Sequence, residues 1–116
     1  MVDGVTSLAT FQDWEKIDLR VAEIESVEEI KGADKLYKLG IDVGELGKRT
    51  ICAGIKQYYE KDELKGKKII YFSNLTPRVM KGIESQGMLL AASTEDHGKV
   101  ILLTVEKDIE NGCRIG

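Results

Sequence analysis

Apolar residues recur at every second position through much of this chain, and that spacing is the strongest constraint on its fold. In residues 37–43 an apolar side chain stands at each odd position, while Lys38, Gly40 and Asp42 fill the even ones. Successive side chains of a β-strand point to opposite faces of the sheet, so this period places one face in a core and the other in water. The segment is therefore predicted to be a half-buried strand.

Further strands are predicted at 17–24, 49–53, 68–72 and 88–92, with another at 100–105 near the end of the chain. In the first of these the apolar residues stand at odd positions up to Val21, whereas the next large apolar residue, Ile24, stands at an even position. A slip within one long strand indicates a bulge or bend, as expected at the corner of a barrel.

Residues 55–65 lose the two-residue period and suit one or two helical turns between the third and fourth strands. A β-sandwich would require about seven strands and no inserted helix. We therefore expect an all-β chain, a five-stranded Greek-key OB-fold barrel with a short helix between strands 3 and 4 and a C-terminal β extension.

The length of 116 residues suits one domain with one core. Residues 1–10 are expected to form a flexible N-terminal tail, and residues 11–116 the barrel domain. Thr10 followed by Asp13 indicates the start of a short helix that carries Phe11 and Trp14 on one face.

Residues suited to catalysis or metal binding are scarce. His97 is the only histidine and stands in an acidic turn, and Cys52 and Cys113 are too far apart for a zinc motif. No catalytic residue, metal site or cofactor is therefore expected. The chain also shows no signal peptide and no apolar run of membrane-spanning length, so we expect a cytoplasmic protein without a membrane partner.

Charge is distributed unevenly along the chain. Residues 31–81 carry twelve Lys and Arg against six Asp and Glu, whereas the chain as a whole has a net charge of −3. Phosphate attraction depends on the local field, so a basic middle section can bind nucleic acid within an acidic protein. Charge alone equally fits ordinary solvated lysines.

The segment 74–88 is long for a connection in a small barrel, and long ordered loops often carry function. It offers cations for phosphate and neutral donors for bases, sugars or phosphates. Its candidate nucleic-acid contacts are Asn74, Arg78, Lys81, Ser85, Gln86 and Met88. A lid or a dimer contact is the alternative for this loop, and a core position is the alternative for Met88.

Three further candidates, Lys35, Lys38 and Arg49, belong to the strands and loops on the binding face of such barrels. Only Tyr37 is a candidate stacking aromatic there, and this scarcity favours recognition of the shape and backbone of a folded RNA.

Three motifs stand out along the chain: Phe11–Val21, Gly32–Tyr37 and the run from Asn74 through Arg78 to Gly82–Met88. In this order they resemble the tRNA-binding domain at the C-terminus of methionyl-tRNA synthetases. Similar domains occur in free-standing tRNA-binding proteins and in endothelial monocyte-activating polypeptide precursors, and a secretion chaperone shares the fold.

The resemblance implies an RNA site lined by Asn74, Arg78, Ser85 and Met88, with Lys35 beside it. It also implies tRNA binding as a homodimer whose surface comes from the C-terminal strands and the segment near Trp14. The chain would then be a noncatalytic β subunit of methionyl-tRNA synthetase, partnered by a catalytic chain. A free-standing chaperone-like dimer and a protein-docking module are the alternatives.

Overall fold

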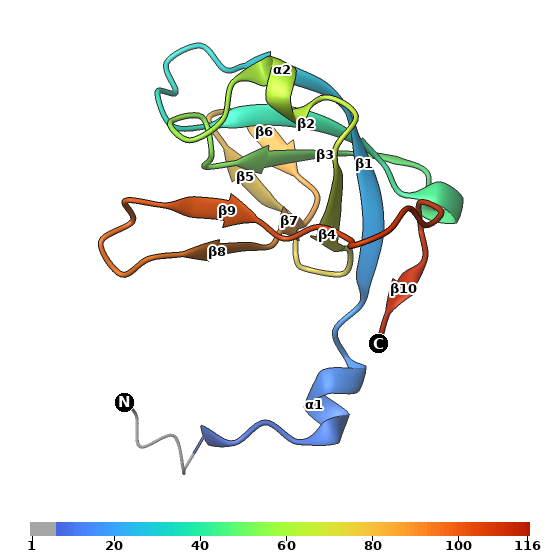
Figure 1. Ribbon diagram of the computed structural model, residues 1–116. Coiled ribbons are helices and arrows are strands. Elements are labelled where there is room, and N and C mark those ends of the chain that lie inside the picture. Colours follow the sequence, from blue (N-terminus) through green and yellow to red (C-terminus); the bar gives the residue numbers. More distant parts are fainter. Residues whose placement is uncertain (1–6) are drawn as a thin grey trace.

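Strand β1 (Leu19–Glu29) is the centre of the fold, because three other strands pair with it. The computed structural model describes residues 7–116, so most of the predicted tail lies outside the described residues. Strands β2 (Tyr37–Asp42), β4 (Lys68–Phe72) and β10 (Arg114–Ile115) run antiparallel to β1. Figure 1 shows the long, curved β1 passing along the whole barrel.

The main sheet has the order β3-β2-β1-β4-β7, where β3 is Lys48–Ala53 and β7 is Met88–Leu89. A 3₁₀ turn, η2 (Gly44–Leu46), joins β2 to β3, and helix α2 (Lys61–Leu64) precedes β4. This order, with the helix between the third and fourth strands, confirms the predicted OB-fold. The pairing of β1 with β2 shifts register between Ile24 and Ser26, so β1 contains a bulge, but beyond the predicted place. Pairing is regular from Leu19 to Ile24, and the apolar phase changes there because Val21 and Ala22 are both buried.

Residues 85 and 86, just before β7, bond to the edge strand β3 through backbone and side-chain atoms and so help to close the barrel. The backbone amide of Gln86 donates to the Thr50 carbonyl at 2.8 Å, and the Thr50 amide donates back to Gln86 Oε1 at 2.9 Å. Two residues farther along β3, the Cys52 amide donates to Ser85 Oγ at 2.9 Å. The free edge of β3 is thereby satisfied without a continuous backbone ladder.

The core fills the barrel with the alternating residues that the sequence pattern indicated. Leu39, Ile41 and Ile51 are fully buried, as are Leu64 of α2 and Tyr71 of β4. A smaller cluster of Ile30, Ala33 and Cys52 lies apart from this core.

The segment 74–88 is more regular than the sequence suggested. It contains a hairpin of β5 (Arg78–Met80) and β6 (Ile83–Ser85), joined by Lys81 and Gly82. Both turn residues have positive φ, 52° and 81°, as the two-residue turn that suits strand twist requires. The expectation of one long loop is therefore wrong. The first turn position usually holds glycine, asparagine or aspartate, and the lysine at position 81 does not indicate a turn.

The C-terminal strands are shorter than predicted. The segment 88–92 divides at Leu90, because β7 pairs with β4 whereas β8 (Ala91–Ser93) pairs with β9 (Val100–Leu102). The predicted strand 100–105 therefore ends at Leu102. The β8–β9 hairpin projects from the barrel in Figure 1.

Helix α1 (Phe11–Glu15) stands away from the barrel in Figure 1. The Thr10 hydroxyl accepts from the Asp13 amide, and the Asp13 carboxylate accepts from the Thr10 amide, which forms the capping box expected at this start. Neither α-helix in residues 7–116 has the length and apolar character needed to cross a membrane.

Candidate nucleic-acid interface

The cations of the basic middle section divide into paired and free groups. Five of the twelve have a carboxylate partner within 4.0 Å, namely Lys38, Lys48, Lys56, Lys61 and Lys68. Lys35, Arg78 and Lys81 have no such partner among residues 7–116, and all three are exposed. Seven of the twelve are therefore unpaired within residues 7–116, and the charges of Lys35, Arg78 and Lys81 are among those available to an anionic ligand.

Lys35 lies in the loop that joins β1 to β2, and the following β3–α2 segment holds this loop in place. The Lys56 amide donates to the Lys35 carbonyl at 3.2 Å. The Lys56 ammonium contacts the Ala33 carbonyl at 3.5 Å and pairs with Glu29 at 2.9 Å. Lys56 therefore stabilises the loop that contains Lys35.

Lys81 reaches the same place from the tip of the β5–β6 hairpin. It lines a hollow of about 390 Å³ together with residues 32–36, which include Lys35. The hairpin is seated by Met80 and Ile83, whose side chains pack against the cluster of Ile30, Ala33 and Cys52. Two segments almost fifty residues apart thus bring two lysines without carboxylate partners to one hollow, which Asp34 also lines.

Of the two remaining exposed or half-exposed candidates, Met88 lines a hollow and Arg78 lines neither of the two. Arg78 belongs to the same hairpin as Lys81 and is exposed. Met88 is half-buried and lines a second hollow, of about 640 Å³, which Lys35 also borders. The structure therefore gathers Lys35, Lys81 and Met88 around adjoining hollows, with Arg78 beside them.

Ser85 has a different environment. Its side chain is buried, with 2% of its surface exposed, and its hydroxyl accepts from the Cys52 amide and donates to the Gly87 carbonyl at 3.1 Å. Gln86 is half-buried, with its side-chain oxygen bonded to the Thr50 amide. Both side chains use these polar atoms within the protein, to close the barrel.

Asn74 and Arg49 also make structural contacts. Asn74 Oδ1 accepts from the Asp18 amide at 2.9 Å, and its Nδ2 donates to the Lys16 carbonyl at 2.7 Å, which ties the start of β1 to the end of β4. Arg49 is half-buried and donates to the Ser73 carbonyl at 3.1 Å.

Lys38 and Tyr37 complete the set of predicted positions on β2. Lys38 faces Glu28 at 3.8 Å across the β1–β2 pair. Tyr37 is 5% exposed and donates to the Tyr59 carbonyl, so its expected role as a stacking platform is wrong. Its place at an inward-facing position of β2 accounts for this burial.

The residues that complete the larger hollow were not predicted as site residues. Leu36, Gly54, Gln57, Tyr58 and His97 line it, and the Tyr58 hydroxyl donates to the His97 carbonyl at 2.8 Å. The positive φ of His97, 57°, fits the turn that the sequence indicated. Pairing between residues 39 positions apart has no local sequence signal.

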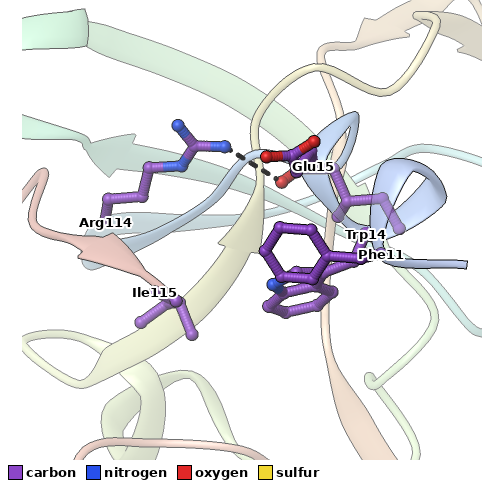
Figure 2. A pocket seen from close by; sticks show the side chains of 7 residues that line it. Phe11, Trp14, Glu15, Arg114 and Ile115 are labelled. Atoms are coloured by element: carbon purple, nitrogen blue, oxygen red, sulfur yellow. Dashed lines mark hydrogen bonds between the residues drawn. The ribbon is translucent and has the colours of Figure 1, made fainter.

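A separate hollow of about 370 Å³ lies between α1 and the C-terminus, lined in part by Phe11, Trp14 and Ile115 (Figure 2). Phe11 is 71% exposed and Trp14 40% exposed. Arg114 donates to the Ile17 carbonyl at the rim of this hollow, which holds the C-terminal strand against the α1–β1 connection.

An ion pair stabilises this end of β1. Arg20 Nε lies 2.6 Å from Asp18 Oδ1, and Arg20 also donates to the Gly112 carbonyl. The hydrogen bond from Arg20, with a further contribution from the charges of Arg20 and Arg114, lowers the pKa of Asp18 despite its partial burial.

Known proteins resemble this chain over most of its length. Methionine–tRNA ligases from Caldanaerobacter subterraneus and Methanocaldococcus jannaschii are 56% and 50% identical to it over 91% and 87% of the chain. The matched regions make up only 16% and 15% of those two proteins, so the chain spans about a sixth of the length of these relatives.

Two solved structures superimpose on this chain over nearly their whole length. A MetRS related protein from Pyrococcus horikoshii superimposes with a TM-score of 0.87 at 40% identity, covering 94% of this chain and 98% of that one. The chaperone CsaA from Bacillus anthracis gives a TM-score of 0.85 at 30% identity, covering 94% and 99%. The family model described as "Putative tRNA binding domain" matches residues 19–114, and the chain therefore belongs to this tRNA-binding domain family.

Proposed function

We propose that this chain binds folded tRNA, without catalysing a reaction itself, through the surface that Lys35, Arg78, Lys81 and Met88 form. The observation that carries the proposal is the meeting of Lys35 and Lys81 at one hollow, with no carboxylate partner for either within residues 7–116. Cations left free in this way can neutralise phosphates and release bound counterions. Asn74, Ser85, Gln86 and Arg49 support the surface, and Lys38 contributes charge at its edge.

The same surface favours recognition of RNA shape and backbone. Tyr37 and Tyr71 are buried, and Tyr58 and Tyr59 are half-buried with their hydroxyls engaged in the protein. None of these four tyrosines offers an exposed ring for the stacking that single-strand binders use, and the exposed Phe11 and Trp14 belong to the separate hollow beside α1. Lys35 and Lys81 belong to two loops that are anchored to the barrel, and cations spaced by such loops suit a folded RNA whose phosphates have fixed positions.

We further propose that the chain acts as a β subunit of methionyl-tRNA synthetase, supplying tRNA affinity to a separate catalytic chain in the cytoplasm. Support comes from the methionine–tRNA ligases that contain a region similar to it. Co-purification with a catalytic chain, and a fall in that enzyme's KM for tRNA when this chain is added, would test the assignment.

A homodimer is part of the proposal. Phe11, Trp14 and Ile115 border the hollow beside α1, and Ile101 and Leu103 are 57% and 38% exposed on the C-terminal segment. Apolar side chains left in water favour burial against a second copy. Light scattering should give twice the mass of one chain, and Trp14→Asp should reduce it to one.

A free-standing chaperone-like dimer is the second candidate function. It is favoured by the CsaA chaperones of Bacillus anthracis and Picrophilus torridus, whose whole chains match this one at TM-scores of 0.85 and 0.84. Peptide binding that is indifferent to salt and unaffected by tRNA would support this alternative.

The shape claim can be tested by competition. Unlabelled folded tRNA should displace labelled tRNA at a much lower concentration than a single-stranded RNA of equal length, because only the folded molecule presents phosphates in fixed positions. Equal displacement would contradict recognition of shape, and no tRNA binding at low salt would contradict the function itself.

A further inference from the structure

The hollow that Met88 lines lies beside the one that Lys81 borders, and it is the larger of the two. It has a volume of about 640 Å³, within the range of roughly 300–1,000 Å³ that small-molecule sites occupy. Lys35 and Leu36 belong both to this hollow and to the smaller one that Lys81 borders. The two hollows therefore adjoin along the β1–β2 loop.

Apolar side chains form much of the lining. Leu36, Ile55, Met88, Leu89 and Val100 contribute aliphatic or thioether groups to it. Neither Leu36 nor Met88 is fully buried, so part of this apolar surface remains exposed to water. A planar, weakly hydrated group would bury that surface on entering.

Polar groups lie in the same wall. Gln57 and His97 are exposed, and their amide and imidazole groups can donate or accept hydrogen bonds. Such groups suit the edge of a nucleobase, which carries donors and acceptors around a flat apolar face.

Hydrogen bonds join the segments that line the hollow, and they leave the side chains of Gln57 and His97 available to a ligand. The segment 55–59 bonds to the β1–β2 loop through Lys56 and Lys35, and to the β8–β9 hairpin through the Tyr58 hydroxyl and the His97 carbonyl. The Leu102 amide donates to the Tyr59 hydroxyl at 3.1 Å on the same side. The hollow is therefore preformed, which lowers the ordering cost of a ligand.

We infer that this hollow holds one unpaired nucleobase of the bound RNA, while Lys35 and Lys81 bind the phosphates next to it. The inference rests on the proposed tRNA-binding function and adds a base-binding site to recognition of the backbone. Charge complementarity selects the occupant: Lys35, which has no carboxylate partner among residues 7–116, lines both hollows, and a nucleotide carries its phosphate beside its base. An apolar peptide side chain would leave that cation without a partner.

Gly54 allows the hollow to be filled without disturbing its surroundings. A Cβ built on Gly54 finds only Leu36 Cδ2 within 4 Å, at 3.9 Å, and its φ lies outside the left-handed region. Gly54→Phe should therefore place a ring in the hollow, whereas Gly54→Ala adds a methyl group and leaves the hollow open. The two variants lose the same glycine, which makes the alanine variant a matched control.

The test measures tRNA affinity for the full chain and both variants. We expect Gly54→Phe to weaken binding about tenfold relative to Gly54→Ala, as is typical for loss of one base contact. Equal affinity of the two variants would overturn the base-binding inference while leaving the proposed function intact. Failure of the unaltered chain to bind tRNA would instead overturn the proposed function.

Amide NMR spectra locate the base independently of whole-tRNA affinity. Adenosine, guanosine, cytidine and uridine monophosphates should shift the amides of Gly54, Ala91 and Ser93, whereas ribose 5-phosphate should shift only residues near Lys35 and Lys81. Identical maps for nucleotide and sugar phosphate would overturn the inference. So would an apolar peptide that shifts the hollow's amides and is not displaced by the nucleotides.

Discussion

The Ser85 hydroxyl lies 2.9 Å from the Cys52 backbone amide and joins the β5–β6 hairpin to the free edge of β3. The same hydroxyl donates to the Gly87 carbonyl, so a buried donor and a buried acceptor are satisfied by one side chain. This contact fixes the hairpin that carries Arg78 and Lys81. It connects the stability of the barrel to the placement of the proposed RNA surface.

Ser85→Ala should therefore lower the free energy of unfolding by about 1–3 kcal/mol, since the Cys52 amide is left buried without a partner. Urea denaturation followed by far-UV circular dichroism would measure the change. Ser93→Ala removes an exposed serine and should change stability by less than about 0.5 kcal/mol. Equal effects of the two substitutions would contradict the structural role of Ser85.

Gly87 has a φ of 106°, and a Cβ there would lie 2.3 Å from the Phe72 carbonyl oxygen and 2.8 Å from Tyr71 Cε1. Gly87→Ala should therefore destabilise the chain by about 3 kcal/mol or more, from backbone strain and overlap together. Gly66 has a φ of 87° with open space around it, so Gly66→Ala should cost only about 1–2 kcal/mol. Thermal unfolding of both variants checks the difference, and a smaller loss at Gly87 would contradict the close packing.

Lys81 occupies a left-handed conformation that asparagine tolerates better than lysine. Lys81→Asn should raise stability by about 0.5–1 kcal/mol and weaken tRNA binding, because it relaxes the turn and removes a free cation. Lys81→Arg keeps both the charge and the strain, so both its stability and its affinity should stay near those of the unaltered chain. Unchanged tRNA affinity of Lys81→Asn would argue against a role for this tip in RNA binding.

The pKa of Asp18 is lowered in the folded chain, first by its hydrogen bond from Arg20. An unfolded chain binds a proton at Asp18 at a higher pH than the folded chain does, so the stabilisation is full above about pH 4 and is lost as the pH falls further. Asp18→Asn should reduce the dependence of stability on pH in that acidic range. Parallel curves for the two proteins between pH 2 and pH 4, roughly the affected range, would contradict this account.

The strands were predictable where apolar and polar residues alternate, because this pattern is a local signal. The alternation in 37–43 predicted β2, whereas the phase change before Ile24 reflects burial of both Val21 and Ala22, and the bulge lies after Ile24. The hairpin within 74–88 escaped prediction because Lys81, rather than glycine or asparagine, opens its turn.

Site residues were less predictable than strands. The sequence does not show whether a polar side chain faces solvent or bonds within the barrel. Ser85 bonds to a residue 33 positions away, and Asn74 to residues 56 and 58 positions away. Charge was more informative: the basic middle section contains Lys35 and Lys81, which the fold brings to one hollow. Which of its twelve cations are paired with carboxylates depends on strand register, which the sequence alone does not reveal.

The central claim is that free cations of two anchored loops bind tRNA phosphates, and the salt dependence of affinity tests it most directly. The logarithm of the association constant should fall steeply and linearly with the logarithm of salt concentration. Replacing Lys35, Arg78 and Lys81 together by alanine should reduce the slope by about 2–3, at roughly 0.7–0.9 for each phosphate contact. Lys65→Ala removes an exposed cation that borders neither hollow and should leave the slope nearly unchanged. A slope that is the same for the triple variant as for the unaltered chain would contradict the account.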